Sequence, residues 1–378
     1  MYTIALKMLF GDRLKYLMLV SAIAFSSLLM AQQSSVFSGL MLWTTATLQN
    51  TNVPIWVMDT NVEQVNEVRP LVDTDLSRVR SVPGVSWAVP FYFSIQQARL
   101  YDGRFKSIQL FGVDSTTLIG VPRDMVAGNL DDLRQADAVI IDEVGVYKLS
   151  GGRKPLAVGD SFEINDHQAT VVGICVAARS FSGNPYVYTT YERALEIVPP
   201  TRSNLSFILV QPREGVDQEA LARKITETTR LKALTNNQFF WSTIWWYVNN
   251  TGIPISFGTT IFLGFIVGFA VSGQTFYTFI LENLSNLGAL KAIGASNSLL
   301  YRMLILQALV AGFIGYGIGL GLASLFGFST LKTGQPPYYM PYQVPLFSFI
   351  VVLLICFFSA FIAIRKISKM DAAEVFRA

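Results

Sequence analysis

Four long stretches of the sequence are almost entirely apolar and contain no Asp, Glu, Lys, Arg or His. A helix needs about 20 mostly apolar residues to cross the hydrocarbon core of a membrane. Each stretch is long enough, so the pattern predicts four spanning helices. They cover residues 16–43, 253–280, 303–328 and 344–364.

The first stretch also has the features of a secretory signal peptide, because the basic residues Lys7, Arg13 and Lys15 precede it. Two observations favour a retained helix instead. Apolar character resumes at Val36–Trp43, and the residues around Met30 form a poor cleavage site. We therefore expect a membrane anchor that is not removed.

Basic residues near the spans predict the orientation, because cytoplasmic loops carry an excess of Lys and Arg. Nine Lys and Arg residues lie in the segments 1–15, 281–302 and 365–378, whereas the loop 329–343 has only Lys332. Both termini and the 281–302 link are therefore expected in the cytoplasm. Residues 44–252 and the 329–343 loop are expected outside.

The external segment 44–252 has the mixed signals of a water-exposed domain. Runs rich in β-branched and aromatic residues predict strands at 53–59, 86–100, 107–113, 138–141, 161–164, 169–176, 186–189 and 206–211. Asp102-Gly103 predicts a hairpin turn between two of them. Helical patterns occur at 63–69, 74–82, 191–197 and 217–231. The predicted fold class is an α-helical integral membrane protein with four transmembrane helices and a large α+β extracytoplasmic domain between helices 1 and 2.

Aromatic residues gather just before the second span, at Trp241, Trp245, Trp246 and Tyr247. Such rings favour the boundary between membrane and water. We expect an interfacial anchor here, and contact with an amphiphilic substrate is the alternative.

Composition separates the chain into two unlike parts. The whole chain is 51% hydrophobic and 15% charged with a net charge of +3, which excludes a disordered chain and a strongly basic nucleic-acid binder. Residues 44–252 have a net charge of −3 and the remainder +6. No nucleic-acid partner is expected.

The residues that usually carry metal or catalytic chemistry are scarce. There is one histidine, His167, and there are two cysteines, Cys175 outside and Cys356 within the fourth span. This excludes a Cys/His metal cluster and a disulfide framework. We expect His167 in an exposed turn, and no catalytic residue, metal or cofactor on this chain.

One motif is misleading. Ala138–Glu143 is an apolar strand that ends in Asp142 and Glu143, like the metal-binding strand of a P-loop ATPase. Such an ATPase also needs the phosphate-binding sequence G-x-x-x-x-G-K-[ST], which the chain lacks. We therefore expect no nucleotide site.

Glycines recur at a spacing of four in two spans, which lets helix backbones approach closely in lipid. The pairs are Gly264/Gly268, Gly315/Gly319 and Gly317/Gly321. Packing within one chain and packing between two subunits both explain this spacing, and the sequence leaves the choice open.

The spans offer no mid-membrane charge of the kind that ion-driven transporters use as a relay. A partner protein is therefore the expected energy source. The cytoplasmic segment Leu281–Ser296 is too polar to span and predicts one helix with Leu284, Leu287, Leu290 and Ile293 as apolar positions for docking. Gly294 ends this helix and Ser296 starts the next.

The run Leu290–Ser296, Leu-Lys-Ala-Ile-Gly-Ala-Ser, resembles the coupling-helix signature of FtsX/MacB-type ABC transporter permeases. The tail Arg365–Arg377 is similar to the closing pattern of the family, with Ala372 where a proline is usual. Asn283 and Asn286 replace the usual Arg-x-x-Glu pair.

The order of one span, a large external domain and three further spans also resembles this family. The YTTYERA stretch at 188–194 and the early LLMAQQSSVFSGL resemble its DevC-like branch.

The resemblance implies an inner-membrane permease of a bacterial ABC exporter, with no ATPase site of its own. It implies a second copy of the chain, two cytoplasmic ATPase subunits that bind ATP and Mg²⁺, a periplasmic adaptor and an outer-membrane channel. ATP hydrolysis would move the periplasmic domain, a mechanism called mechanotransmission, and the cargo would be a lipid or hydrophobic compound. The implied contacts with the ATPase are Leu287, Leu290, Lys291, Ile293 and Gly294, supported by Asp371, Glu374 and Phe376.

Two alternatives within the family stay open. An FtsX-like signalling subunit would regulate a cell-wall hydrolase through the external domain without moving a substrate. A lipoprotein-releasing permease would normally pair with a different permease.

Overall fold

The structure, a computed structural model, describes residues 2–152, 154–199 and 204–368. The chain forms two compact units. The helical unit comprises Met1–Leu40 and Gly252–Ala378, and the external domain comprises Met41–Thr251.

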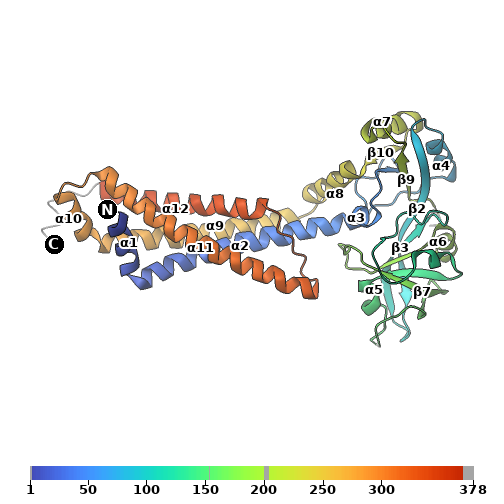
Figure 1. The fold of residues 1–378 in the computed structure, drawn as a ribbon, viewed down its shortest axis with the longest axis horizontal. Coiled ribbons are helices and arrows are strands. Elements are labelled where there is room, and N and C mark those ends of the chain that lie inside the picture. Colours follow the sequence, from blue (N-terminus) through green and yellow to red (C-terminus); the bar gives the residue numbers. More distant parts are fainter. Residues whose placement is uncertain (1, 153, 200–203, 369–378) are drawn as a thin grey trace. The chain divides into compact units, whose positions relative to one another are not determined.

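The helical unit contains four long helices that lie side by side (Figure 1). Its elements are α1 (Tyr2–Gly11), α2 (Arg13–Thr44), α9 (Ile253–Glu282), α10 (Leu284–Ala292), α11 (Asn297–Thr333) and α12 (Gln343–Ser368). Helices α2, α9, α11 and α12 are long and apolar enough to cross a membrane. The prediction of four spanning helices is confirmed.

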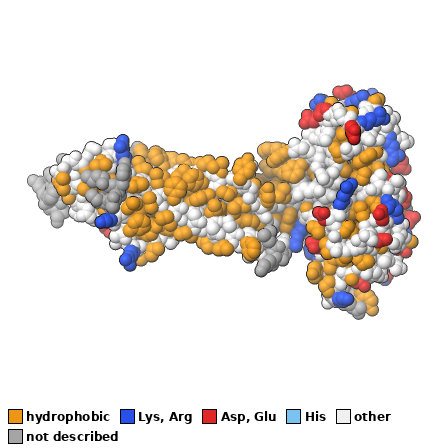
Figure 2. Space-filling model, viewed as in Figure 1, with side chains coloured by type: hydrophobic (Ala, Val, Ile, Leu, Met, Phe, Trp, Pro, Cys, Tyr) orange, Lys and Arg blue, Asp and Glu red, His pale blue; other side chains and the backbone are white. Residues whose placement is uncertain are grey.

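Apolar side chains of the helical unit face both inward and outward. Ile23 of α2, Phe276 of α9 and Ile355 of α12 are buried in one shared core. Phe262 and Leu325 are mostly exposed, and Figure 2 shows orange apolar side chains spread along the visible surface of this unit. Such a surface suits contact with lipid.

The external domain is a mixed α/β domain. Its helices are α3 (Ala46–Thr51), α4 (Asp73–Arg80), η1 (Leu130–Arg134), α5 (Glu143–Lys148), α6 (Tyr191–Ile197), α7 (Gln218–Thr229) and α8 (Asn236–Asn250). Its strands are β1 (Ile55–Met58), β2 (Val85–Arg99), β3 (Phe105–Val113), β4 (Met125–Gly128), β5 (Ala138–Asp142), β6 (Ser161–Ile164), β7 (His167–Cys175), β8 (Tyr186–Thr190), β9 (Phe207–Pro212) and β10 (Lys232–Thr235). This confirms the predicted large domain between the first and second spans.

All ten strands belong to one sheet, in the order β10-β1-β9-β2-β3-β8-β5-β7-β4, with β6 paired to β2 and β7. The pairs β3–β8 and β5–β7 are parallel, and the others are antiparallel. The 15-residue strand β2 holds the sheet together, because it pairs with β9 along its first half and with β3 along its second.

Alternation along the strands builds a core on each face of the sheet. Ile55 and Val57 of β1 pack in a core with α4 and α7, whereas Trp56 and Met58 pack in a core with α3 and α8. Every residue of β1 is buried, because helices cover both faces.

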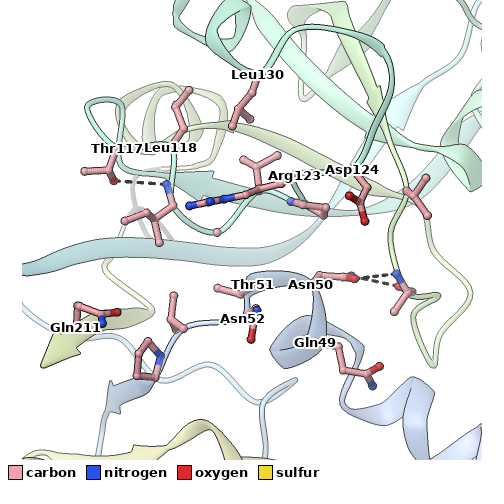
Figure 3. Close-up of a pocket in the computed structure, with 18 of the residues that line it drawn as sticks. Gln49, Asn50, Thr51, Asn52, Thr117, Leu118, Arg123, Asp124, Leu130 and Gln211 are labelled. Carbon is pink, nitrogen blue, oxygen red and sulfur yellow. Dashed lines mark hydrogen bonds between the residues drawn. The ribbon is translucent and has the colours of Figure 1, made fainter. Parts of the chain in front are cut away.

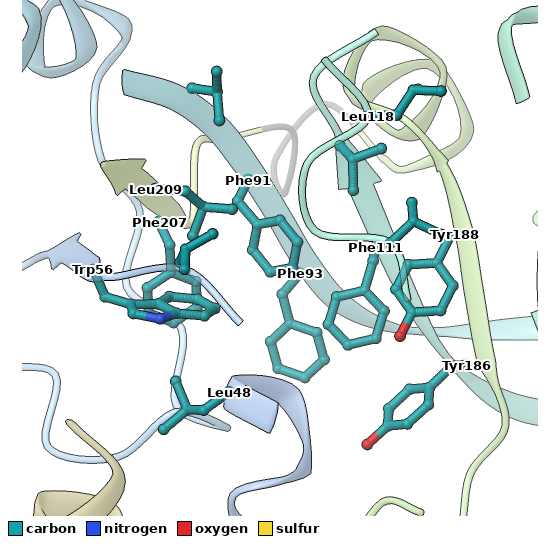
Figure 4. Close-up of a cluster of buried hydrophobic side chains, with 14 of the residues drawn as sticks. Leu48, Trp56, Phe91, Phe93, Phe111, Leu118, Tyr186, Tyr188, Phe207 and Leu209 are labelled. Atoms are coloured by element: carbon teal, nitrogen blue, oxygen red, sulfur yellow. The ribbon is translucent and has the colours of Figure 1, made fainter. Parts of the chain in front are cut away.

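Aromatic rings fill the core on the α3 and α8 side (Figure 4). Trp56 meets Phe91 and Phe207 edge-on at centroid distances of 5.6 and 5.5 Å. Phe111 stacks on Phe93 at 5.0 Å and on Tyr188 at 5.2 Å. Such pairs add about 0.5–1.5 kcal/mol each beyond the burial of their area.

Two hairpin turns connect neighbouring strands through residues with positive φ. The predicted hairpin at Asp102-Gly103 joins β2 to β3, and Gly103 has a positive φ of 83°. Asn165 and Asp166 join β6 to β7 with φ of 48° and 66°, the conformation of a type I′ turn. His167 is therefore the half-buried first residue of β7 and not a turn residue, which corrects our expectation.

The predicted helix at 63–69 is wrong. The segment is irregular, since side chains and a distant hydroxyl bind its backbone N–H groups in place of helical carbonyls. Gln64 Oε1 accepts from the N–H of Asn66 at 2.7 Å, and Thr243 Oγ1 accepts from the N–H of Val65 at 3.2 Å. Pro70 then prevents helical continuation.

Candidate functional site

The segment between α9 and α11 forms a short, sharply bounded helix, α10. Asn283 separates it from α9, and its Nδ2 donates to the carbonyl of Phe279 at 2.9 Å. Gly294 follows with φ of 101°, a conformation that favours glycine. Ser296 then caps α11 by accepting the N–H of Leu299 at 3.3 Å. The predicted stop at Gly294 and start at Ser296 are confirmed.

Leu287 packs α10 against the core of the helical unit. Its side chain is only 2% exposed and belongs to the core that contains Ile280 of α9 and Leu300 of α11. Leu290 is partly buried against the same core. These two leucines therefore hold α10 in place. The amphipathic pattern had suggested that both are available for docking, whereas Leu287 faces inward.

The end of α10 points away from the bundle. Ile293 is 86% exposed, and Gly294 is exposed as well. Lys291 is half-buried. An apolar side chain so open at a bend is suited to a protein contact, so Ile293 and Gly294 form the candidate contact surface of this segment. Asp371, Glu374 and Phe376 lie outside the described residues.

An ion pair next to α10 was not predicted from the sequence. Lys15 near the start of α2 pairs with Glu282, the last residue of α9, and with Asp12 at 2.8 Å. Gln307 of α11 also donates from Nε2 to the carbonyl of Ala5 at 2.6 Å, which holds α1 against α11. The contacts Lys15–Glu282 and Gln307–Ala5 have no local sequence signal, because the partners are far apart along the chain.

Four of the six singled-out glycines allow close packing inside this chain. A Cβ at Gly315 or Gly319 would lie 2.8 Å from Ile23 Cβ or 2.4 Å from the carbonyl oxygen of Ala24, both on α2. Gly268 and Gly264 of α9 likewise face Ser26 and Leu29 of α2. A Cβ at Gly317 or Gly321 would meet nothing within 4 Å among the described residues.

Asp142 has a structural position. It is buried at the end of β5, where its Oδ1 accepts the N–H groups of Gly145 at 2.9 Å and Tyr186 at 3.1 Å. Burial raises its pKa from 3.8 to about 6. Burial likewise raises the pKa of the Cys175 thiol to about 12, so this cysteine is unreactive.

The external domain also contains a cleft of about 750 Å³ that sequence analysis did not indicate (Figure 3). One wall is residues 49–54, the end of α3 and its connection to β1, and the opposite wall is the loop 117–124. Residues of four further segments complete it, so only the fold brings the lining together.

Two family models match the chain. Residues 18–228 match the MacB-like periplasmic core domain, and residues 258–372 match the FtsX-like permease C-terminal domain. Together with the four apolar helices, these matches indicate a multi-pass membrane protein with a periplasmic domain.

Two solved structures are similar to part of the chain. The extracellular domain of the ABC-type transporter YknZ from Gram-positive bacteria is 18% identical, with 48% of this chain and 98% of that chain covered and a TM-score of 0.35. The periplasmic region of MacB from Actinobacillus actinomycetemcomitans is 16% identical, with 53% and 94% covered and a TM-score of 0.38.

The periplasmic core model alone covers more than half of the sequence, and the permease model covers the three later spans and the segment between the first two of them. The chain therefore belongs to the MacB/FtsX-type family of ABC transporter permeases.

Proposed function

We propose that this chain is the permease subunit of an ABC exporter and has no ATPase site of its own. Permeases of this family generally work with an ATPase partner. The four apolar stretches contain no ionisable side chain that would serve as an ion relay, which supports an energy source outside the membrane.

The observation that carries the proposal is the arrangement of α10. Its buried Leu287 ties it to the core shared by α9 and α11, while Ile293 stands exposed beside it. A force applied at Ile293 would therefore reach both spanning helices through packed side chains. We assign Ile293 and Gly294 to the ATPase contact and Leu287 and Leu290 to positioning.

The proposed assembly contains two copies of this chain and two cytoplasmic ATPase subunits that bind ATP and Mg²⁺. Movement of the periplasmic domain would drive export of a lipid or hydrophobic compound through a periplasmic adaptor and an outer-membrane channel. The chain would lie in the bacterial inner membrane with both termini in the cytoplasm.

The test replaces the exposed apolar contact by a charge. Because Ile293 is largely exposed in its own chain, Ile293→Asp should leave the permease folded. Docking of the ATPase would then bury an unpaired carboxylate at the interface. We expect at least a tenfold loss of ATPase co-purification and of permease-stimulated ATP hydrolysis.

Ile95→Asp is the matched control, since Ile95 is an exposed isoleucine of the external domain. It should leave both measurements unchanged. Wild-type binding and stimulation by the Ile293→Asp protein would contradict the assignment.

A further inference from the structure

The cleft in the external domain has firmly held walls. The side chain of Asn50 bonds both backbone groups of Ala178, accepting its N–H at 2.7 Å and donating to its carbonyl at 3.2 Å. The N–H of Val176 donates to the carbonyl of Asp124 at 2.8 Å. These bonds connect three of the segments that line the cleft, so its shape exists before any ligand arrives.

The loop 117–124 is also held from within. Asp114 accepts the N–H of Thr117 at 2.9 Å, and the buried Leu118 adopts a positive φ of 52°. Such a backbone is costly for leucine and persists only where its surroundings fix it. The next turn contains Gly120 at φ of 109°, packed against Phe91.

Apolar side chains form part of the lining. Trp87, Ile119 and Leu130 are half-buried, and Val176 is 47% exposed. The volume of about 750 Å³ lies within the range of clefts that enclose small molecules. The cleft can therefore receive an apolar group of substantial size.

Arg123 gives the cleft a positive charge. Its side chain reaches across the cleft between the Thr117–Leu118 segment and Asn52 (Figure 3). Within the part of the chain that the structure describes, its guanidinium makes no hydrogen bond or ion pair. Other arginines of this domain, such as Arg99 and Arg134, are paired with carboxylates.

Polar amides accompany this charge. Asn52 and Gln211 line the cleft on the side opposite Thr117 (Figure 3). The carboxylate of Asp124 lies on the Asn50 side of Arg123 and is the acidic group of the lining. A guanidinium with donor amides nearby suits a carboxylate or a phosphate, which accept two hydrogen bonds from arginine.

We infer that this cleft binds an anionic amphiphile. Its carboxylate or phosphate head binds Arg123, and its apolar portion lies against Trp87, Leu130 and Val176. This inference rests on the proposed export function for the identification of the ligand as cargo. It narrows the substrate class from any hydrophobic compound to one with an acidic head.

The experiment measures binding by the purified full chain in amphipol, without ATPase. Three photoreactive probes share a ten-carbon diazirine chain: an alkanoic acid, an alkyl phosphate and the methyl ester of the acid. Adducts are located by mass spectrometry. We expect both anions to label the cleft lining around Trp87, Leu130 and Val176, with the ester about tenfold weaker.

Substitutions identify the charge that matters. Arg123→Gln should lower anion labelling about tenfold, the loss expected for one charge-assisted hydrogen bond. Arg223→Gln is the matched control, because Arg223 is an exposed arginine of α7 outside the cleft lining. Asp124→Asn should increase labelling by removing a like charge near the anion.

The outcomes separate this inference from the proposed function. Equal labelling by the ester, unchanged labelling of Arg123→Gln, or adducts only elsewhere would overturn the inference. The ATPase measurements on Ile293→Asp do not depend on these results. Stronger labelling by the acid would indicate a fatty-acid-like head, and stronger labelling by the phosphate a phospholipid-like head.

Discussion

A single carboxylate, Asp142, connects three elements of the external domain. It ends β5, caps α5 through the N–H of Gly145, and accepts the first N–H of β8 from Tyr186. Both bonds go to Oδ1. Because the side chain is buried, the charged form loses hydration that two hydrogen bonds do not fully replace.

The pH dependence of stability follows from this burial. The pKa of Asp142 is about 6 in the folded domain against an ordinary 3.8, so between these values the folded state binds the proton more tightly. Its contribution to stability is therefore present at low pH and is lost as pH rises through 6. The pKa difference corresponds to at most about 3 kcal/mol.

Asp142→Asn should remove this pH dependence. Asparagine keeps an Oδ1 acceptor for both N–H groups but carries no charge, so we expect equal or greater stability at pH 7.5. The measurement is thermal unfolding of the full chain at pH 5 and pH 7.5, followed by tryptophan fluorescence. An unchanged difference between the two pH values in the variant would contradict this explanation.

At the scale of elements, glycines of α9 and α11 lie directly against α2. Gly268 and Gly319 allow this approach, because a side chain at either position would overlap atoms of α2. Gly317 lies on another face of α11, where a side chain meets nothing within 4 Å among the described residues. The regularly spaced glycines of α11 thus lie on two different faces of the helix.

Substituting the two surfaces separately tests this distinction. Gly319→Val would bring a Cβ to 2.4 Å from the carbonyl oxygen of Ala24 and should destabilise the helical unit by about 1–3 kcal/mol. Gly317→Val should leave the thermal stability of the monomer unchanged. Equal effects of the two substitutions on the melting temperature in detergent would contradict this difference in packing between the two positions.

The same substitutions bear on the second copy of the chain. If Gly317 and Gly321 lie at an interface between subunits, Gly317→Val should reduce dimer cross-linking without loss of monomer stability. This outcome would decide between the two explanations that the spacing alone left open.

Sequence patterns predicted elements whose signals are local and strong. Twenty-residue apolar runs, alternating strands and the Asp102-Gly103 turn needed no distant partner. The prediction of a helix at 63–69 was wrong because Thr243, which is far along the chain, binds the backbone of this segment. Helix α8 was missed although the Thr235-x-x-Gln238 capping box marks its start, and both bonds of that box are present.

The candidate sites were predictable to different degrees. The segment that became α10 had a motif and glycine and serine boundaries, so its place along the chain was evident. Which of its leucines faces inward depends on packing with α9 and α11. The cleft around Arg123 had no signal, because its lining comes from six separate stretches of sequence.

Over the whole molecule, charged side chains are distributed very unevenly. Figure 2 shows acidic and basic side chains spread over the external domain and few along the helical unit. Residues 233–281, from β10 through most of α9, contain no charged residue. The basic residues of the remainder lie mainly at the ends predicted to face the cytoplasm.

Labelling of single cysteines tests this orientation. Both native cysteines, Cys175 and Cys356, are buried and should react slowly. A membrane-impermeant maleimide should label Tyr342→Cys in intact spheroplasts, because this exposed position lies in the predicted external loop. Asn286→Cys in α10 should react only after permeabilisation. Labelling of Asn286→Cys in intact spheroplasts would reverse the orientation.

The seating of Leu287 bears on how the transporter is assembled. If the leucines of a docking segment were buried only at the interface with a partner, the unbound permease would expose an apolar surface that is prone to aggregation. Here the bundle itself shelters Leu287, and Ile293 is the large apolar side chain that the described end of α10 leaves in water. If an ATPase docks at this end of α10, as we propose, the bundle buries Leu287 whether or not that ATPase is bound.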